Sequence, residues 1–286
     1  MDAITLPRID AAPEDIAGAL FAGDTGSRGK FLVGDAVEIL GSWETPCIDL
    51  TVTSPPCDNL CNCNGCEFDP KSMLSAILHV TRPGGVCVWV VGERINGGRS
   101  LTSFEHAFIG RDVGWTVHDV MIHQKRNTPF MRSNGYTNCY ELMIVFASGK
   151  PGTFNPIMEP TRRNGWETAV HSKGPDAVNR KRPVRLRKET VRTNIWQSAV
   201  GLGGTTTDRV AFEHPAVMPE RLAEDHILSW SNPGDTVLDP MCGSGTTCKM
   251  AAIHRRDWIG IDVSERYIDI ARQRLPDPQM PGDALA

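Results

Sequence analysis

The sequence lacks any long apolar run, and this absence excludes one class of protein. No stretch approaches the roughly 18 consecutive apolar residues that a membrane-spanning helix needs. The N-terminal residues MDAITLPRID have neither the basic start nor the apolar stretch of a secretory signal peptide. We therefore expect an intracellular protein with no membrane partner.

A disulfide framework and internal repeats are also missing. The nine cysteines are odd in number, so they cannot all pair, and thiols of intracellular proteins usually stay reduced. We expect the cysteines to serve in packing, metal binding or catalysis. The 286 residues, 40% of them hydrophobic, suffice for one sizeable core with a small additional lobe.

The net charge of −4 is unevenly distributed. Residues 161–192 contain ten basic and three acidic side chains, so this segment carries +7 and the remainder carries −11. Such a segment suits a face presented to phosphates. A solvated basic loop would have the same composition, so charge alone does not decide between the two.

Apolar runs rich in β-formers alternate with segments of helical character, and this pattern predicts an α/β fold with a mostly parallel sheet. The predicted strands are 30–33, 48–53, 86–91, 116–124, 141–147, 236–238 and 258–261. The predicted helices are 70–80, 103–113, 219–230, 246–254 and 264–275. Thr246 and Ser264 each offer a hydroxyl that can cap the helix starting there.

A tight glycine turn follows one of these strands. In TVLDPMCGSGTT, Asp239 and Pro240 end an apolar strand, and Gly243-Ser244-Gly245 precedes a helix. Glycines allow positive φ and close approach to a ligand, and a helix start offers unpaired N–H groups. Asp262 ends the next strand, in WIGIDVSERYIDIARQRL, where an acid can bind two ribose hydroxyls. Together they predict a nucleoside-binding site.

A second motif follows a different strand. The run IDLTVTSPPC ends in Ser54-Pro55-Pro56, and consecutive prolines cannot continue a central strand, so the chain must leave the sheet in an extended turn. Such a turn can direct a hydroxyl and a carbonyl at one point.

The segment HPAVMPERLAEDHILSWSNPGDTVLDPMCGSGTT resembles the cofactor half of the β-group DNA amino-methyltransferases, and the resemblance covers about residues 30–276. It implies a Rossmann-like fold that binds S-adenosylmethionine (SAM), with Asp35 of FLVGDAVEIL near the adenine and Asp262 holding the ribose. The implied cofactor-binding residues are Asp35, His214, Pro215, Pro219, Glu220, Asp239, Pro240, Cys242, Gly243, Gly245, Thr246 and Asp262.

The same resemblance implies that Ser54 and the Pro55 carbonyl accept hydrogen bonds from the exocyclic amine of a flipped base. Serine at the first position is commoner in enzymes that act on cytosine N4, and adenine N6 stays open. The family's aromatic residue after Pro56 is replaced by Cys57, which removes a stacking interaction of about 1–3 kcal/mol. A rebuilt pocket could obtain its platform from Phe68, Trp89 or Phe130.

Two other interpretations of Cys57 stay open. It could be the nucleophile of a cytosine C5 methyltransferase, with Glu93 holding the base. It could also bind zinc with Cys61, Cys63 and Cys66. That spacing differs from paired C-x2-C knuckles, and one short loop rarely wraps a tetrahedral ion, so we predict no metal.

The basic segment is the expected DNA-binding element, because a flipped base requires a firm grip on the backbone. Its candidate DNA-binding residues are Arg162, Arg163, Arg180, Lys181, Arg182, Arg185, Arg187 and Lys188. The run QKRNTPFMRSNGYTNCYELMIVFASGKP resembles the segment lining the family's base pocket, which makes Phe130, Asn134 and Tyr140 secondary candidates.

These observations predict a site-specific methyltransferase that flips a base from double-stranded DNA, most favourably cytosine, in the cytoplasm of a bacterial, archaeal or phage-infected cell. The expected parts are an N-terminal arm (1–27), a catalytic half (28–150), a basic target-recognition insertion (151–208), a SAM-binding half (209–276) and a tail (277–286). A homodimer, a partner restriction nuclease, an RNA substrate and an inactive SAM- or DNA-binding protein stay open.

Overall fold

The computed structural model describes residues 21–22, 27–56, 68–95, 98–127, 133, 135–161, 166–171, 180–185 and 187–275. The chain divides into two compact units. The first comprises residues up to Asn155 and from Asn194 onward, and the second comprises Pro156–Thr193.

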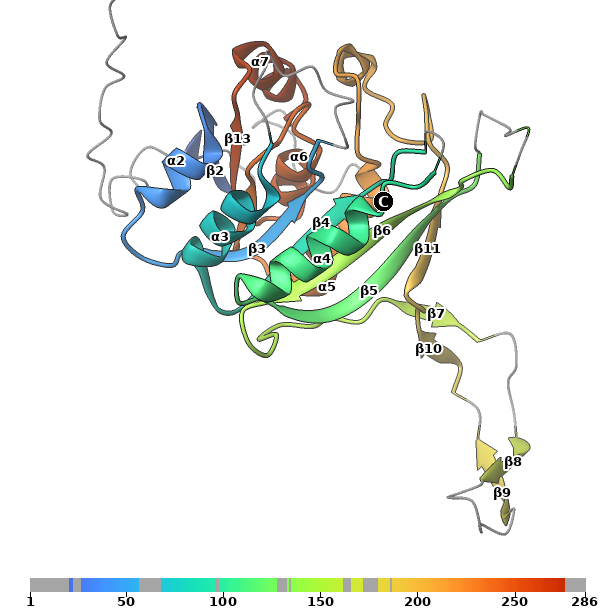
Figure 1. Cartoon of the computed structure of the whole chain (residues 1–286). Coiled ribbons are helices and arrows are strands. Elements are labelled where there is room, and N and C mark those ends of the chain that lie inside the picture. The colour runs from blue at the N-terminus through green and yellow to red at the C-terminus, as the bar shows by residue number, and fades with distance from the viewer. Residues whose placement is uncertain are drawn as a thin grey trace, which may run out of the picture. The chain divides into compact units, whose positions relative to one another are not determined.

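The first unit is an α/β domain (Figure 1). Its strands are β1 (Phe21–Ala22), β2 (Arg28–Val33), β3 (Ile48–Thr53), β4 (Thr81–Val91), β5 (Thr116–Lys125), β6 (Tyr140–Ala147), β11 (Ile195–Ser198), β12 (Thr236–Asp239) and β13 (Asp257–Asp262). Its helices are α2 (Ala36–Gly41), α3 (Pro70–Val80), α4 (Thr102–Asp112), η1 (Arg209–Glu213), α5 (Glu220–Trp230), α6 (Thr246–Ile253) and α7 (Glu265–Gln273). Each predicted strand and helix is confirmed within a few residues of its ends, apart from β4, which starts earlier.

The nine strands form one sheet in the order β1-β2-β13-β12-β3-β4-β6-β5-β11. The five adjacent strands β2, β13, β12, β3 and β4 are parallel to one another. By contrast, β1 is antiparallel to β2, and β6 runs antiparallel between β4 and β5. The predicted α/β class with a mostly parallel sheet is confirmed. The order places β12 and β13, from the C-terminal part of the chain, between β2 and β3, from the N-terminal part.

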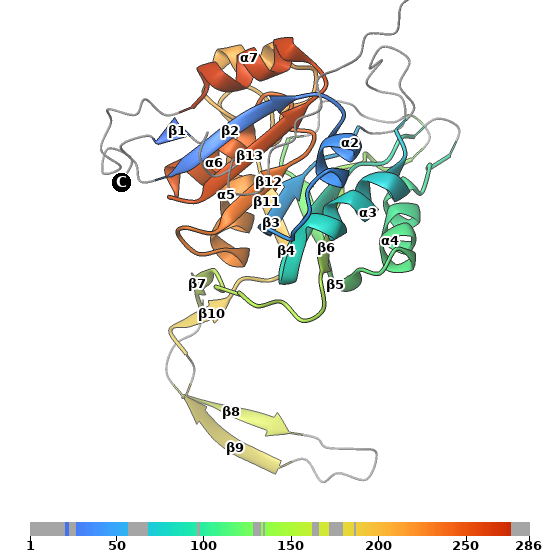
Figure 2. The same ribbon diagram turned by 90° about the vertical axis from the view of Figure 1, so that its left-hand side faces the viewer.

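Helices cover both faces of this sheet (Figure 2), with α2, α3 and α4 on one face and α5, α6 and α7 on the other. A core cluster of buried side chains on the first face contains Leu40, Leu74, Ile77, Trp89 and Phe146. Because both faces are covered, the central strands are buried on both sides, as the burial of β3 and β4 shows. None of the described helices combines the length and apolar character that crossing a membrane requires.

Local sequence explains where several helices start. Asp69 caps α3 through the N–H groups of Lys71 and Ser72, and Pro70 follows at the first helical position. Ser264 caps α7 by accepting from Tyr267 N, as predicted. The prediction that the Thr246 hydroxyl caps α6 is wrong, since the cap is Gly245 at φ +77° and no side chain caps that helix.

The second unit consists of two antiparallel strand pairs. β7 (Met158–Pro160) pairs with β10 (Glu189–Val191), and β8 (Trp166–His171) pairs with β9 (Arg180–Arg185). This unit, Pro156–Thr193, is a shorter segment of the chain than the predicted insertion of residues 151–208. Residues 194–208 belong to the first unit because β11 pairs with β5 there, from Ile195 opposite Ile122 to Ser198 opposite Lys125.

Candidate functional site

The two predicted motifs lie at the same edge of the sheet. β12 ends at Asp239 and β13 at Asp262, while β3, which is parallel to β12, ends at Thr53 just before Ser54. Parallel strands present their carboxyl ends together, and open α/β sheets bind ligands at that edge. The glycine turn and the Ser-Pro-Pro turn are therefore neighbours, although Ser54 and Asp239 are 185 positions apart in the sequence.

The glycine turn has a backbone conformation that residues with a Cβ atom rarely adopt. Gly243 has φ +49° and Gly245 has φ +77°, and a Cβ at Gly245 would lie 2.6 Å from the Cβ of Ala271. Gly245 N donates to the Cys242 carbonyl at 2.7 Å, closing the turn. The α6 N-terminus that follows has no side-chain cap, so its first-turn N–H groups face the sheet edge without helical partners.

Asp262 is joined directly to this turn. Its Oδ2 accepts from Gly243 N at 2.9 Å and its Oδ1 accepts from Ser264 N at 2.8 Å. A carboxylate has about four acceptor positions, so these two bonds orient the group and leave capacity for further donors. The donors and acceptors of this edge fit a cofactor with a ribose and a charged amino-acid end.

Asp239 has a different surrounding. It is 4% exposed and its Oδ1 accepts from Thr53 Oγ1 at 2.7 Å and from Met241 N at 3.3 Å. Burial raises its pKa to about 6 even though these hydrogen bonds act in the opposite direction. Asp239 therefore connects the end of β12 to the end of β3.

Asp35 caps a helix, and His214 lies against the glycine turn. Asp35 follows β2 and caps α2, with Oδ1 accepting from Val37 N and Glu38 N. The His214 ring packs against Tyr267 with centroids 4.3 Å apart, and its Nε2 would lie 2.8 Å from a Cβ at Gly243. Burial lowers the pKa of His214, which favours the neutral ring beside the turn.

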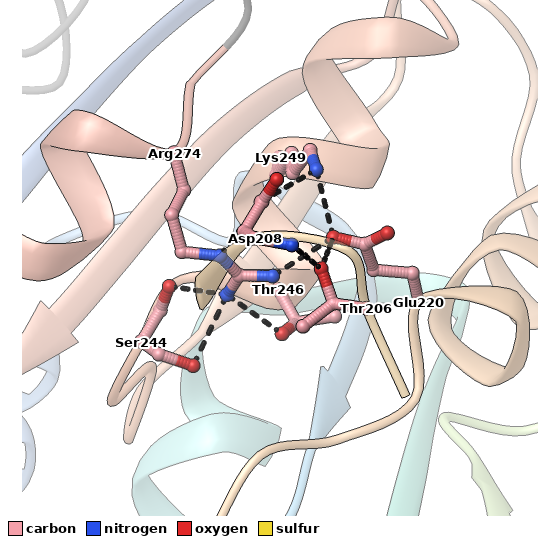
Figure 3. A network of polar contacts seen from close by, with 7 residues as sticks. All are labelled: Thr206, Asp208, Glu220, Ser244, Thr246, Lys249 and Arg274. Carbon is pink, nitrogen blue, oxygen red and sulfur yellow. Dashed lines mark hydrogen bonds and ion pairs between the residues drawn. The ribbon is translucent and has the colours of Figure 1, made fainter. Parts of the chain in front are cut away.

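The Glu220 carboxylate is already paired with other side chains of the protein. Its Oε1 accepts from Thr206 Oγ1 and Lys249 Nζ at 2.7 Å each and from Arg274 Nη2 at 2.9 Å (Figure 3). Of the other predicted residues, Pro219 is the buried N-cap of α5. Pro240 and Cys242 are buried, whereas Pro215 is exposed.

In the Ser-Pro-Pro turn, Ser54 is exposed, Pro55 is buried and Pro56 is half-buried. Cys57, Cys61, Cys63 and Cys66 lie outside the described residues, and so does Phe130. Trp89 is wrong as a stacking platform, because it is fully buried and donates from Nε1 to His106 Nδ1 at 3.0 Å. Phe68 packs on the Trp89 side of the core, with ring centroids 6.3 Å apart.

Glu93 follows β4 and already has two partners. Its carboxylate pairs with Arg99 Nη1 at 2.6 Å and accepts from Ser103 Oγ at 2.6 Å, and its side chain is 5% exposed. The Arg99 guanidinium lies over the Tyr140 ring, 5.2 Å from its centroid. The sequence analysis did not identify Arg99 as a partner of Glu93. No motif marks it, and the sequence Gly-Gly-Arg-Ser around it is typical of a surface turn.

The predicted DNA-binding residues lie in the second unit. Arg180, Lys181, Arg182 and Arg185 are on β9, and Arg187 and Lys188 are exposed just after it. Arg162, Arg163 and the base-pocket candidate Asn134 lie outside the described residues. No group of three or more His, Cys, Asp or Glu side chains in the described part of the chain could hold a metal ion.

This fold is an open, largely parallel α/β sheet with a glycine turn and an acid at the carboxyl ends of its strands. Such an arrangement is typical of enzymes that bind a nucleoside-containing cofactor. The chain belongs to the family of N6 and N4 DNA methylases, whose model, described as DNA methylase, matches residues 48–273. The amino-methyltransferase family predicted from the motifs is confirmed.

Two relatives support the assignment. The orphan methyltransferase M.BamHII of Bacillus amyloliquefaciens is 44% identical over 236 residues, covering 80% of this chain and 88% of the relative. The type II methyltransferase M.HinfI of Haemophilus influenzae is 26% identical over 275 residues, covering 85% of this chain and 67% of the relative.

Two solved structures share the fold. The cytosine-N4-specific PvuII DNA methyltransferase has a TM-score of 0.65 at 19% identity, covering 90% of this chain and 89% of that one. The M1.HpyAVI–SAM complex has a TM-score of 0.55 at 22% identity, covering 86% of this chain and all of that one. At these identities the likeness establishes the fold alone.

Proposed function

We propose that this DNA methylase transfers a methyl group from SAM to the N4 amine of a cytosine flipped out of duplex DNA. One observation carries the proposal: Ser54 is exposed at the end of β3, beside the strand that carries the glycine turn. A serine, rather than an aspartate, opens the Pro-Pro motif, and in the family this is commoner among enzymes that act on cytosine N4.

The chain's own residues divide the work. The α6 N-terminus, the glycine turn and Asp262 hold SAM, which supplies the methyl group. Ser54 Oγ and the Pro55 carbonyl accept hydrogen bonds from the exocyclic amine, so the nitrogen lone pair is directed away from the ring and toward the methyl donor. The amine proton is released to solvent after transfer. This positioning is the main contribution that a protein can make to such a displacement.

The C5 alternative needs a thiolate at Cys57 and a carboxyl group free to hold the base. Glu93, the candidate for that carboxyl, is committed to Arg99 and Ser103 and is 5% exposed. Because this side chain is buried as well as paired, the surrounding residues would have to rearrange before Glu93 could contact a base. This observation favours amine transfer.

The test is to incubate the chain with SAM and unmodified DNA, digest the DNA to nucleosides and identify the methylated species by mass spectrometry. We expect N4-methylcytosine from the wild type and from Cys57→Ser, with a loss of at least about 100-fold for Ser54→Ala, as for the loss of one positioned donor or acceptor. Ser75→Ala, at an exposed serine of α3, is the matched control and should retain full activity.

Other outcomes identify the alternatives. C5-methylcytosine that disappears in Cys57→Ser would replace amine transfer by covalent catalysis. N6-methyladenine would retain the mechanism and overturn the choice of base. Methylation of structured RNA but not of duplex DNA at equal salt would overturn the substrate class.

A further inference from the structure

Arg274, which follows α7, is buried beside the glycine turn and forms hydrogen bonds with it (Figure 3). Its side chain is 0% exposed. Nη1 donates to the Ser244 carbonyl at 2.6 Å, to Ser244 Oγ at 3.1 Å and to Thr246 Oγ1 at 3.0 Å. Nη2 donates to Glu220 Oε1 at 2.9 Å and Nε to Asp208 Oδ2 at 3.1 Å.

A second cation completes the cluster. Lys249, on α6, donates to Asp208 Oδ2 and Glu220 Oε1 at 2.7 Å each, so two cations face two carboxylates. Thr206 Oγ1 donates to the same Glu220 oxygen and accepts from Asp208 N. Buried ions are tolerated only when paired and hydrogen-bonded in this way.

The cluster connects the glycine turn to the segment leading into α5. Thr206 and Asp208 precede η1, and Glu220 opens α5. Arg274 donates a hydrogen bond to the Ser244 carbonyl. Ser244 is flanked by Gly243 and Gly245, which both have positive φ. A turn fixed before the ligand arrives loses less conformational freedom on binding.

We propose that Arg274 is a positioning residue for the cofactor turn and sets the affinity for SAM without touching it. The planar guanidinium reaches carbonyl, hydroxyl and carboxylate partners at once, which a lysine ammonium cannot do. The role rests on the proposed binding of SAM at this turn, but is independent of the base that is methylated.

The experiment uses the full chain with Arg274→Met and Arg274→Lys. We expect the SAM dissociation constant, measured by calorimetry without DNA, to rise about tenfold or more in Arg274→Met, the effect of losing hydrogen bonds to a charged group. The rise should be smaller in Arg274→Lys, which keeps the charge balance. The KM for SAM should rise in parallel, while the KM for DNA stays at the wild-type value.

Arg256 provides a matched control. It is 4% exposed and donates to Ser231 Oγ, the Ser231 carbonyl and the His254 carbonyl. It precedes β13, at the opposite end of that strand from Asp262. Arg256→Met should therefore lower the melting temperature while leaving the SAM dissociation constant unchanged.

The outcomes separate positioning from ordinary core stabilisation. If Arg274→Met behaves like Arg256→Met, with a lower melting temperature and unchanged SAM affinity, the proposal is overturned. If Arg274→Met does not fold, Arg274→Lys decides, because weaker SAM binding at a near-native melting temperature supports positioning and wild-type binding overturns it. A wild type that binds SAM but methylates another base contradicts only the proposed function.

Discussion

At the scale of single residues, Asp239 and Glu220 show that an acid in a motif can also take part in the framework of the fold. Both fall within segments that resemble the cofactor half of the family, yet Asp239 accepts from Thr53 and Glu220 pairs with Lys249 and Arg274. Their sequence neighbours are the same in either role. The partner that decides the role comes from a distant part of the chain.

The raised pKa of Asp239 predicts a stability that falls as pH rises. With a folded-state pKa of about 6 and an unfolded value near 4, the folded chain binds the proton more tightly, so stability is lost between about pH 4 and pH 6. Asp239→Asn removes this dependence and keeps an acceptor for Thr53. We expect the variant to gain about 3 kcal/mol relative to the wild type from pH 4 to pH 7.

Urea unfolding of both chains at several pH values measures this difference. Asp208→Asn is the opposite control, because hydrogen bonds from Lys249 and Arg274 outweigh burial and lower the pKa of Asp208. Its destabilisation should be complete at pH 7 and shrink below about pH 4. Curves that stay parallel for wild type and Asp239→Asn would show that Asp239 ionises equally in both states.

At the scale of elements, α2 combines a structural cap with a proposed cofactor contact. Both capping bonds use Oδ1 of Asp35, and the preceding Gly34 N donates to the Asp262 carbonyl at 3.0 Å. The cap therefore lies next to the acid proposed to hold the ribose. The two roles of Asp35 are compatible and can be separated by substitution.

Asp35→Ala should lower the free energy of unfolding by about 1 kcal/mol, whereas Asp35→Ser, which can still cap, should stay near the wild type. If Asp35 also lies close to the bound cofactor, both variants should bind SAM more weakly. Thermal unfolding and calorimetry with SAM measure the two effects. Wild-type SAM affinity in Asp35→Ser would confine Asp35 to capping α2.

The long elements were predictable because their signals are local. The apolar run of β3 and the Asp69-Pro70 start of α3 each lie within one short segment. Among the strands that were not predicted, β7, β10 and β11 have only three or four residues, too little pattern to distinguish them from a loop. Pairing with distant residues, such as β11 with β5, makes them strands.

At the scale of the whole molecule, the second unit has a high density of basic residues, with ten of the 30 Lys and Arg residues of the chain. The second unit, Pro156–Thr193, makes its own strand pairs. In the first unit, Asn155 N donates to the Ser229 carbonyl and Ile122 N donates to the Asn194 carbonyl. The chain is therefore anchored on both sides of the second unit.

Replacing residues 156–193 by a glycine-serine linker should leave the first unit folded and able to bind SAM with unchanged affinity. DNA binding should weaken, and the slope of log K against log salt should become shallower by about 0.9 for each DNA phosphate that is no longer neutralised. Fluorescence titrations over a salt series measure this slope. A shortened chain that keeps the wild-type slope would contradict the assignment of DNA binding to the second unit.

The sequence by itself determined the α/β class, the glycine turn and the Ser-Pro-Pro turn, because periodicity, φ preference and the missing proline N–H act within a few residues. Only the tertiary structure decided that Trp89 is core, that Glu220 is paired and that Arg274 grips the turn. Glu220 and Arg274 are 54 positions apart, and their pairing depends on the path of the chain between them. Buried charge must find a partner, and the folded chain determines which one is near.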